Sequence, residues 1–274
     1  GTIETPINPL TINGGAGIST NSGAVRLIGG NLTWDRTGAG SLTNTGTIEA
    51  NPGRGLTLNG GVVHLSNANE IATDTLIFSD LTLNLAVDWS SGSPLTQLIR
   101  STIHGPGRYS NPVGRTLQSR GSTWNTQINN DGLLDVNDST GGSVPVNTFN
   151  AALTNSGRLL LQTISGNFSS AGMVVNATLT NSGLIDLSTN QTTFGLFLTV
   201  NSGTLVNLPT GTISTIGPAN SIARTITAAI DNQGTIETTI NPLTINGGAG
   251  ASTNSGTVRL IGGNLTWDRT GAGS

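Results

Sequence analysis

Few residues of this chain are of the types that catalyse reactions or hold metal ions. Its 274 residues include two histidines, His64 and His104, and no cysteine. The lack of cysteine excludes a thiol nucleophile, a thiolate zinc site and a disulfide. A histidine that acts as a general base needs a hydroxyl or carboxylate partner, and the sequence spacing identifies none for either histidine. We therefore expect both to be surface residues.

Three aspartates, Asp131, Asp135 and Asp138, form the closest group of acids. Two carboxylates that flank a glycosidic bond are the usual requirement of a glycosidase, and parallel β-helices do include enzymes that cleave polysaccharides. Asp131 falls in a predicted turn and Asp135 at an outward strand position, which favours a solvated acidic edge. The sequence predicts no enzyme activity, no catalytic residue, no cofactor and no metal site. A carbohydrate-binding or carbohydrate-cleaving β-helix is the alternative.

Tryptophans can stack on sugar rings, and the chain has four of them: Trp34, Trp89, Trp124 and Trp267. Trp34 follows Leu32 by two positions. Because side chains alternate along a strand, Trp34 points inward if Leu32 does. We therefore expect core or corner aromatics and not a sugar-binding platform.

The commonest pattern in the chain is an Asn-x-Gly turn followed by a short alternating run. An apolar residue stands two positions after each glycine, as expected for a strand with one buried face. Most intervals between successive glycines are about 23 residues, which suits one coil of a solenoid. The predicted corner residues are Asn21, Gly23, Asn44, Gly46, Asn130, Gly132, Asn155, Gly157, Asn181, Gly183, Asn201, Gly203, Asn232, Gly234, Asn254 and Gly256.

The elements that must carry these corners are short parallel strands. The 39 glycines and 10 prolines interrupt every 3.6-residue period, so we expect almost no α-helix. One coil of three short strands cannot bury its apolar face alone, and coils must stack about 4.8 Å apart. The predicted fold is an all-β, right-handed, three-sided parallel β-solenoid (β-helix) with about 20–26 residues per coil.

Stacking would place equivalent corner residues directly above one another. We expect an asparagine ladder in which each amide donates to the carboxamide oxygen of the next coil. Turn chemistry alone would explain the same letters and is the alternative. We expect the glycines to adopt a positive φ. The outward positions predict a cross-coil charge ladder of Glu4, Arg26 and Glu49, repeated at Glu237 and Arg259.

A much longer repeat contains the shorter one. Residues 1–41 and 234–274 align without a gap and match at 38 of 41 positions. Such identity indicates duplication, so residues 1–233 form one full repeat unit of about ten coils, and residues 234–274 begin the next unit of a continuous solenoid. The parent chain should continue with Leu-Thr-Asn-Thr-Gly-Thr-Ile-Glu-Ala. The motif is lost between residues 61 and 129, where we expect about three coils and a loop leaving the solenoid within 91–120.

Several short phrases resemble the repeats of giant bacterial surface proteins. They are Leu-Thr-Asn-Thr-Gly-Thr-Ile-Glu at 42–49, Leu-Thr-Leu-Asn-Gly-Gly at 56–61, and Leu-Thr-Asn-Ser-Gly at 153–157 and 179–183. They look like the β-helical stalks of filamentous-haemagglutinin and autotransporter adhesins. The resemblance covers most of the chain and implies a structural segment of a long secreted stalk, filament or adhesin, located extracellularly at the bacterial cell surface.

The partners expected from this interpretation are neighbouring repeat units of the same chain, self-association laterally or end to end into filaments, and surface glycans. Nucleic acid is not expected, because the 11 basic residues are all arginine and are dispersed. No apolar run approaches the roughly 20 residues of a membrane span. Ice binding is a further alternative, weakened because the residue after each motif glycine does not form a regular threonine array.

Overall fold

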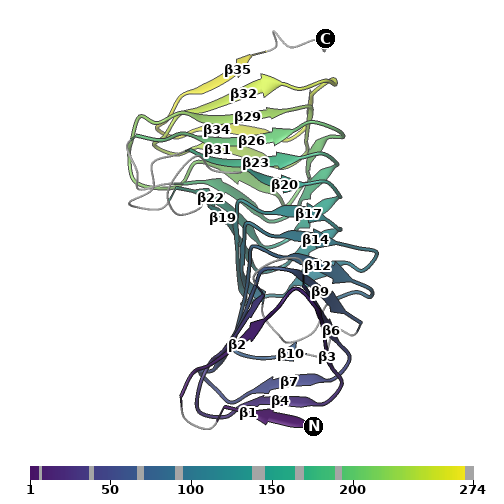
Figure 1. Ribbon diagram of the computed structural model, residues 1–274. Helices are drawn as coiled ribbons and strands as arrows, with labels where there is room; N and C mark the ends of the chain where they lie inside the picture. Colours follow the sequence, from purple (N-terminus) through teal and green to yellow (C-terminus); the bar gives the residue numbers. More distant parts are fainter. Residues whose placement is uncertain are drawn as a thin grey trace.

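The computed structural model describes residues 1–274 except 6–7, 37–39, 67–70, 90–94, 138–145, 164–169, 189–192 and 269–274. Every regular element in the described residues is a β-strand, and none is a helix. The strands stack in parallel as a β-solenoid of about 11 turns, with β1 (Thr2–Glu4) and β35 (Leu265–Asp268) at opposite ends (Figure 1). The predicted all-β parallel solenoid is confirmed.

Two of the three faces run the length of the molecule as twelve-stranded sheets. Face 1 contains, in order, β2 (Leu10–Gly14), β5 (Leu32–Arg36), β8 (Gly55–Asn59), β11 (Thr75–Ser79), β13 (Leu95–Ile99), β16 (Thr116–Arg120), β19 (Leu133–Asn137), β22 (Arg158–Gln162), β25 (Leu184–Leu187), β28 (Thr212–Ser214), β31 (Thr235–Thr238) and β34 (Thr257–Leu260). Face 2 contains β3 (Ile18–Asn21), β6 (Ser41–Asn44), β9 (Val62–Leu65), β12 (Thr82–Leu85), β14 (Thr102–His104), β17 (Thr123–Asn125), β20 (Asn147–Phe149), β23 (Ala171–Val175), β26 (Leu196–Val200), β29 (Arg224–Ala228), β32 (Leu243–Gly247) and β35 (Leu265–Asp268).

Face 3 closes each turn between face 2 and the next strand of face 1, and it is built from two separate sheets. The first sheet contains β1 (Thr2–Glu4), β4 (Ala24–Leu27), β7 (Thr47–Ala50) and β10 (Ile71–Ala72). The second contains β15 (Tyr109–Asn111), β18 (Ile128–Asn130), β21 (Leu153–Asn155), β24 (Leu179–Asn181), β27 (Leu205–Asn207), β30 (Ile230–Asn232) and β33 (Thr253–Asn254). Between the two sheets, Trp89 forms an isolated parallel bridge with Tyr109.

Alternation along the strands places the apolar residues inside. In β5 the side chains of Leu32 and Trp34 are buried, and those of Thr33 and Asp35 are only half-buried. The same register brings Leu32 beside Leu56 of β8, so like residues stack on like inside the solenoid. The core is therefore one continuous column whose coils each complete the burial of their neighbours.

An aromatic column fills the interior where face 3 changes sheets. Phe78, Trp89, Tyr109, Trp124 and Phe149 follow one another with ring centroids 5.5–6.1 Å apart. All five side chains are buried, and burial raises the pKa of the Tyr109 hydroxyl well above its ordinary value. Four of these rings, from Phe78 to Trp124, lie in the stretch in which the Asn-x-Gly corners are missing from the sequence, and Phe149 follows that stretch.

The middle of the chain corrects one expectation. The sequence predicts a loop within residues 91–120. In the described part of that range, residues 95–120, β13, β14, β15 and β16 are regular coil strands, whereas the part of the prediction that falls on residues 91–94 lies outside the described residues. Three strands of face 1 lie between residues 61 and 129, in agreement with about three coils. Between residues 95 and 120, short turns with Gly and Pro join the strands without leaving the solenoid.

The two near-identical segments lie on different faces. Residues 1–21 supply β1, β2 and β3, on faces 3, 1 and 2, whereas their counterparts in residues 234–254 supply β31, β32 and β33, on faces 1, 2 and 3. β1 lies one face before the first strand of face 1, and β31 is the eleventh strand of that face. One 233-residue unit therefore contains ten turns plus one face, and the second copy is turned by one face relative to the first.

Candidate functional site

The corner asparagines form two inner columns. At the end of face 2, Asn21 Nδ2 donates to Asn44 Oδ1 at 2.7 Å, and the column stops where Leu65 takes the equivalent position. At the end of face 3 a longer column runs toward the C-terminus, with each Nδ2 donating to the next Oδ1 at 2.6–2.8 Å. Its members are Asn111, Asn130, Asn155, Asn181, Asn207, Asn232 and Asn254.

Most inner asparagines, from Asn111 to Asn207, bond to backbone groups as well as to their neighbours in the column. Asn155 Nδ2 also donates to the carbonyl oxygen of Leu184 at 3.1 Å, and the carbonyl oxygen of Asn155 accepts from the amides of Ser182 and Gly183. The side chain of Asn155 is fully buried. A buried carboxamide with both donors and acceptors engaged joins the corner of one coil to the strand of the next.

The motif glycines are required by close backbone approach and not by a positive φ. A Cβ atom on Gly157 would overlap the carbonyl oxygen of Gly132 below it, and one on Gly183 would overlap that of Gly157. Among the motif glycines only Gly203 has a positive φ, 87°. The expectation of a positive φ is therefore wrong for the other motif glycines. Glycine is needed at these positions because the stacked coils leave no room for a Cβ atom.

Sequence reasoning placed one asparagine in the wrong column and missed two others. Asn201 does not belong to the inner column, and Asn207, which precedes Gly211 by four residues, occupies that position instead. Asn111, the first member, was missed because Pro112 follows it and no Asn-x-Gly is present. The triplet Leu-Val-Asn at 205–207, beside Leu-Thr-Asn at 153–155 and 179–181, is the signal that could have identified Asn207.

Asn201 belongs to an outer column on the solvent side of face 2. Asn201 Nδ2 donates to Asn176 Oδ1 at 3.0 Å, Asn176 to Asn150 at 2.7 Å, and Asn150 to Asn125 at 2.6 Å. These bonds run toward the N-terminus, opposite in direction to those of the inner columns. They are exposed to solvent, where a hydrogen bond contributes little net stability.

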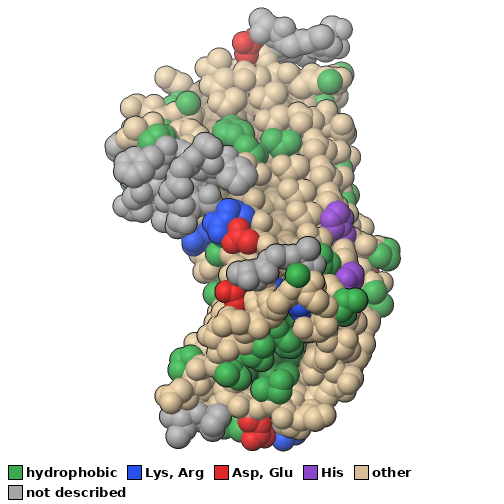
Figure 2. Space-filling model, in the orientation of Figure 1, with side chains coloured by type: hydrophobic (Ala, Val, Ile, Leu, Met, Phe, Trp, Pro, Cys, Tyr) green, Lys and Arg blue, Asp and Glu red, His purple; other side chains and the backbone are tan. Residues whose placement is uncertain are grey.

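Both histidines lie on this same outward row. Asn125 Nδ2 lies 3.3 Å from His104 Nδ1, and Asn84 Nδ2 lies 3.2 Å from His64 Nδ1. The register stacks His64, Asn84 and His104 on successive strands, and Figure 2 shows the two histidines one above the other on an edge of the molecule. Their ring nitrogens thus contact carboxamides of the row.

The residues of the predicted charge ladder lie in register on adjacent strands. Glu4 pairs with Arg26, and Arg26 with Glu49, in adjacent strands of face 3. In the second copy, Arg259 Nη1 lies 3.3 Å from Glu237 Oε2, an ion pair on face 1. A further pair, Arg100 with Asp80 at 2.6 Å, lowers the pKa of the Asp80 carboxyl through hydrogen bonds to the guanidinium. Exposed pairs of this kind hold register more than they stabilise.

Two of the three clustered aspartates, Asp131 and Asp135, make separate hydrogen bonds to neighbouring coils. Asp131 lies at a corner and accepts a bond from Ser156 of the next coil, whereas Asp135 lies on face 1 and accepts bonds from Gln162 at 2.9 Å and Gln118 at 3.3 Å. Asp138 lies outside the described residues. Within the described ranges, no group of three His, Asp or Glu side chains could hold a metal ion.

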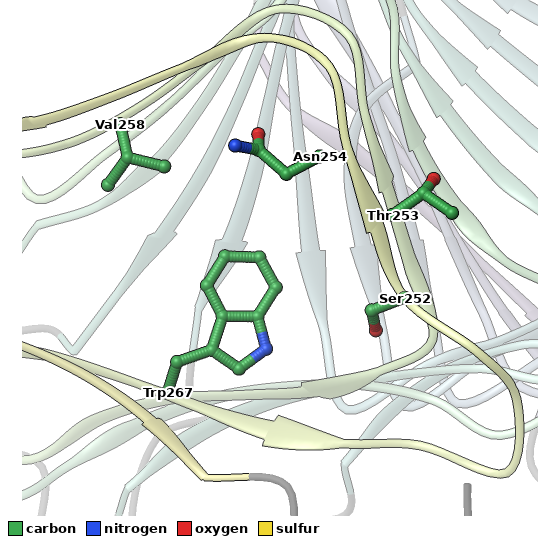
Figure 3. A pocket seen from close by; sticks show the side chains of 5 residues that line it. All are labelled: Ser252, Thr253, Asn254, Val258 and Trp267. Atoms are coloured by element: carbon green, nitrogen blue, oxygen red, sulfur yellow. The ribbon is translucent and has the colours of Figure 1, made fainter. Parts of the chain in front are cut away.

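The tryptophans are core residues. Trp34, Trp89 and Trp124 are buried, and Trp267, the counterpart of Trp34, is partly buried at the C-terminal end of the solenoid. There Trp267 points toward Asn254 and Val258 in a pocket that is the open end of the core (Figure 3). The interpretation of these rings as core aromatics is confirmed.

Comparisons with protein-family models, with curated proteins and with solved structures find no match to this chain. No helix long and apolar enough to cross a membrane occurs in the part of the chain that the structure describes.

Proposed function

We propose that this chain is a structural repeat segment of a long secreted stalk, filament or adhesin at the bacterial cell surface, without enzyme activity or cofactor. The observation that carries the proposal is that the second copy continues the solenoid without a break. The inner asparagine column crosses the boundary between the copies, from Asn207 through Asn232 to Asn254. Repetition of the unit therefore lengthens one rod and adds no separate domain.

The mechanical argument follows from the stacking. Each coil satisfies the backbone groups of the next, and the buried carboxamides pass the register from coil to coil. At about 4.8 Å per turn, ten turns and one face give a unit about 50 Å long. The number of units would then set the length of the stalk, and neighbouring units of the same chain would be its principal partners.

Rod length in chains that carry one, two and three units tests the proposal. Electron microscopy and small-angle scattering should show rods that lengthen by about 50 Å with each added unit at constant diameter. On the producing cells, labelled antibodies against the unit should decorate thin surface fibres. Units that fold as separate beads, or labelling confined to the cell interior, would contradict the proposal. Measurable cleavage of cell-surface polysaccharides by the purified chain would favour the enzyme class instead.

A further inference from the structure

Arg36 is a buried cation that leaves most of its hydrogen-bonding groups unused. It ends β5, and its side chain points into the solenoid with those of Leu32 and Trp34, because side chains alternate along a strand. Only 2% of Arg36 is exposed. Its Nη2 donates to the carbonyl oxygen of Gly17 at 2.7 Å, whereas Nε and Nη1 are buried without a partner. Burial of an unpaired charge is strongly unfavourable, so the fold needs compensation at this place.

The indole nitrogen of Trp34 is a further unused donor on the same inward side of β5. Trp34 Nε1 is buried and has no hydrogen-bond partner, although a buried indole N–H usually finds one. In the equivalent coil of the second copy, Trp267 turns its indole nitrogen toward the side of Ser252, the counterpart of Ser19 (Figure 3). Ser19 lies in β3, just after the corner where Arg36 bonds to the backbone. The same orientation of Trp34 brings both donors to the corner between β2 and β3.

No acidic side chain of the described residues neutralises Arg36. Two positions beside its guanidinium are glycines, since a Cβ atom at Gly14 would lie 3.6 Å from Arg36 Cζ and one at Gly40 2.8 Å from Arg36 Nη2. Asp35 lies on the outward side of β5, where it accepts a bond from Asn59 at 3.3 Å. Burial lowers the pKa of the Arg36 guanidinium, and no carboxylate opposes that shift. The positive charge is thus uncompensated within the described part of the chain.

Arg224 shows how this chain otherwise accommodates a buried arginine. It is 1% exposed and points into the solenoid at the start of β29. Its three nitrogens donate to two backbone carbonyl oxygens and to Asn220 Oδ1, at 2.7–3.1 Å. Burial lowers the pKa of Arg224, and the negative charge of Asp186 opposes that shift. Arg36 has neither the full set of bonds nor the nearby carboxylate.

The missing partner of Arg36 cannot come from outside the solenoid. The three unused nitrogens, Nε and Nη1 of Arg36 and Nε1 of Trp34, are closed off from solvent. A neighbouring molecule, or a further coil before β1, could contact only atoms that solvent can also reach. The partner must therefore be enclosed as the coils stack. All three groups donate and one side chain is cationic, so an anion satisfies both the bonds and the charge, whereas water satisfies only the bonds.

We propose that a small inorganic anion, of the size of chloride, is bound inside the corner between β2 and β3 by Arg36 and Trp34. Nε and Nη1 of Arg36 and Nε1 of Trp34 donate to the anion, and its charge neutralises the guanidinium. A single-atom anion is favoured over sulfate or phosphate, because the site is enclosed and the backbone at Gly14 and Gly40 packs closely on Arg36. The inference concerns the stability of the coil and is independent of a role at the cell surface.

Thermal unfolding of the unmodified chain in chloride and in gluconate, at equal ionic strength, tests the site. The unfolding midpoint should rise by about 3 °C for each tenfold increase in chloride above the dissociation constant. It should not rise with gluconate, which is too large to be enclosed. Arg36→Met keeps an unbranched side chain without the charge and should abolish the chloride dependence. Trp34→Phe removes only the indole N–H donor and should weaken chloride binding about tenfold.

Arg224→Met is the matched control, because it removes a buried arginine whose three nitrogens all have partners within the chain. This variant should unfold at a lower temperature than the unmodified chain but keep the same chloride dependence. A loss of stability alone therefore does not imitate the effect expected of Arg36→Met.

Crystals of the unmodified chain prepared in bromide give a readout that does not depend on the folding of a variant. The anomalous scattering of bromide should place one ion within hydrogen-bond reach of Arg36. Three results would overturn the proposal. They are an ordered water without anomalous signal beside Arg36, an unfolding midpoint that is the same in chloride and gluconate, and a chloride dependence that Arg36→Met retains or Arg224→Met loses.

Discussion

At a buried corner, a side chain must accept one hydrogen bond from the coil below and donate another to the coil above. A carboxamide carries an acceptor oxygen and a donor nitrogen on separate atoms of one planar group, whereas a hydroxyl has both functions on one atom and an ionised carboxylate only accepts. Asn155 uses its oxygen for Asn130 and its nitrogen for Asn181, at 2.6 and 2.7 Å. The identity of the residue at this position therefore follows from stacking as well as from turn propensity.

Removal of one inner asparagine should break both of its ladder bonds at once. Asn155→Ala removes the bond from Asn130 Nδ2, which keeps its bond to the Arg158 carbonyl oxygen, and leaves the buried Asn181 Oδ1 without its ladder donor, at about 1–3 kcal/mol for an unsatisfied buried group. Asn201→Ala, also in an Asn-x-Gly sequence but on the exposed outer column, should cost less than about 1 kcal/mol. Urea unfolding of both variants measures the difference. Equal losses of stability would show that the ladder itself adds nothing.

The column of motif glycines gives a second comparison. Gly157→Ala forces a methyl group onto the carbonyl oxygen of Gly132 and should destabilise the chain by more than about 3 kcal/mol, as overpacking against backbone does at its upper end. Gly17→Ala is the control, because a Cβ at Gly17 meets no atom within 4 Å. Thermal unfolding should separate the two variants widely. A mild effect at Gly157 would mean that the coils can move apart.

A strained backbone position occurs at the corner between faces 1 and 2. Asp80 and Arg100 have φ angles of 55° and 43°, and Gly60, with a φ of 72°, lies one coil below Asp80. Replacement of Arg100 by Gly removes both the strain and the exposed Asp80 ion pair, whereas replacement by Ala removes only the pair. Arg100→Gly should exceed Arg100→Ala in unfolding free energy by about 1 kcal/mol. The reverse order in urea unfolding would contradict a left-handed corner.

At the scale of the strand, two strands of the same sequence can differ in stability, because the stability depends on whether a further coil covers the strand. Trp34 and Trp267 have the same neighbours in sequence, but β8 covers Trp34, and Trp267 lies at the open end. Trp34→Ala should cost about 3–5 kcal/mol, as burial of a large aromatic predicts. Trp267→Ala should cost clearly less, because no described strand covers β35. Equal costs would argue that each coil is stable without its neighbour.

The sequence predicted those strand features that depend on local alternation and spacing. Glycine intervals of about 23 residues, together with an apolar residue two positions after each glycine, were enough to predict parallel coils and the column from Asn130 to Asn181. The length of an individual turn was harder to read. The turn from Ser119 to Val136 is much shorter than the turn from Ile185 to Ile213, because insertions between strands do not disturb the register.

Features that depend on three-dimensional contact could not be predicted from letters. The side chain of Asn201 points outward to solvent, whereas that of Asn207 points into the solenoid. Both follow β26 closely in sequence, so the spacing alone does not tell them apart. The steric reason for the motif glycines could not be predicted either. A Cβ atom there would clash with the glycine of the coil below, and that contact exists only when the coils are stacked. The aromatic column from Phe78 to Phe149 begins in a stretch whose sequence gives no periodic signal, so the contacts between its rings could not be predicted.

At the scale of the whole molecule, the chain behaves as a rod with polarity. Its inner columns donate from N-terminal to C-terminal coils throughout. Repetition of the same coil sequence within one chain would lengthen such a rod without changing its polarity.

The extra face in each unit has a consequence for how long rods pack side by side. Three units complete 31 turns and restore the starting orientation, so any surface mark of a unit recurs along a threefold screw with a true axial period of about 150 Å. Equivalent marks then point in three directions, 120° apart. Rods of this kind can meet like neighbours all round and form bundles, whereas a unit of whole turns would align its marks in one line and favour flat ribbons.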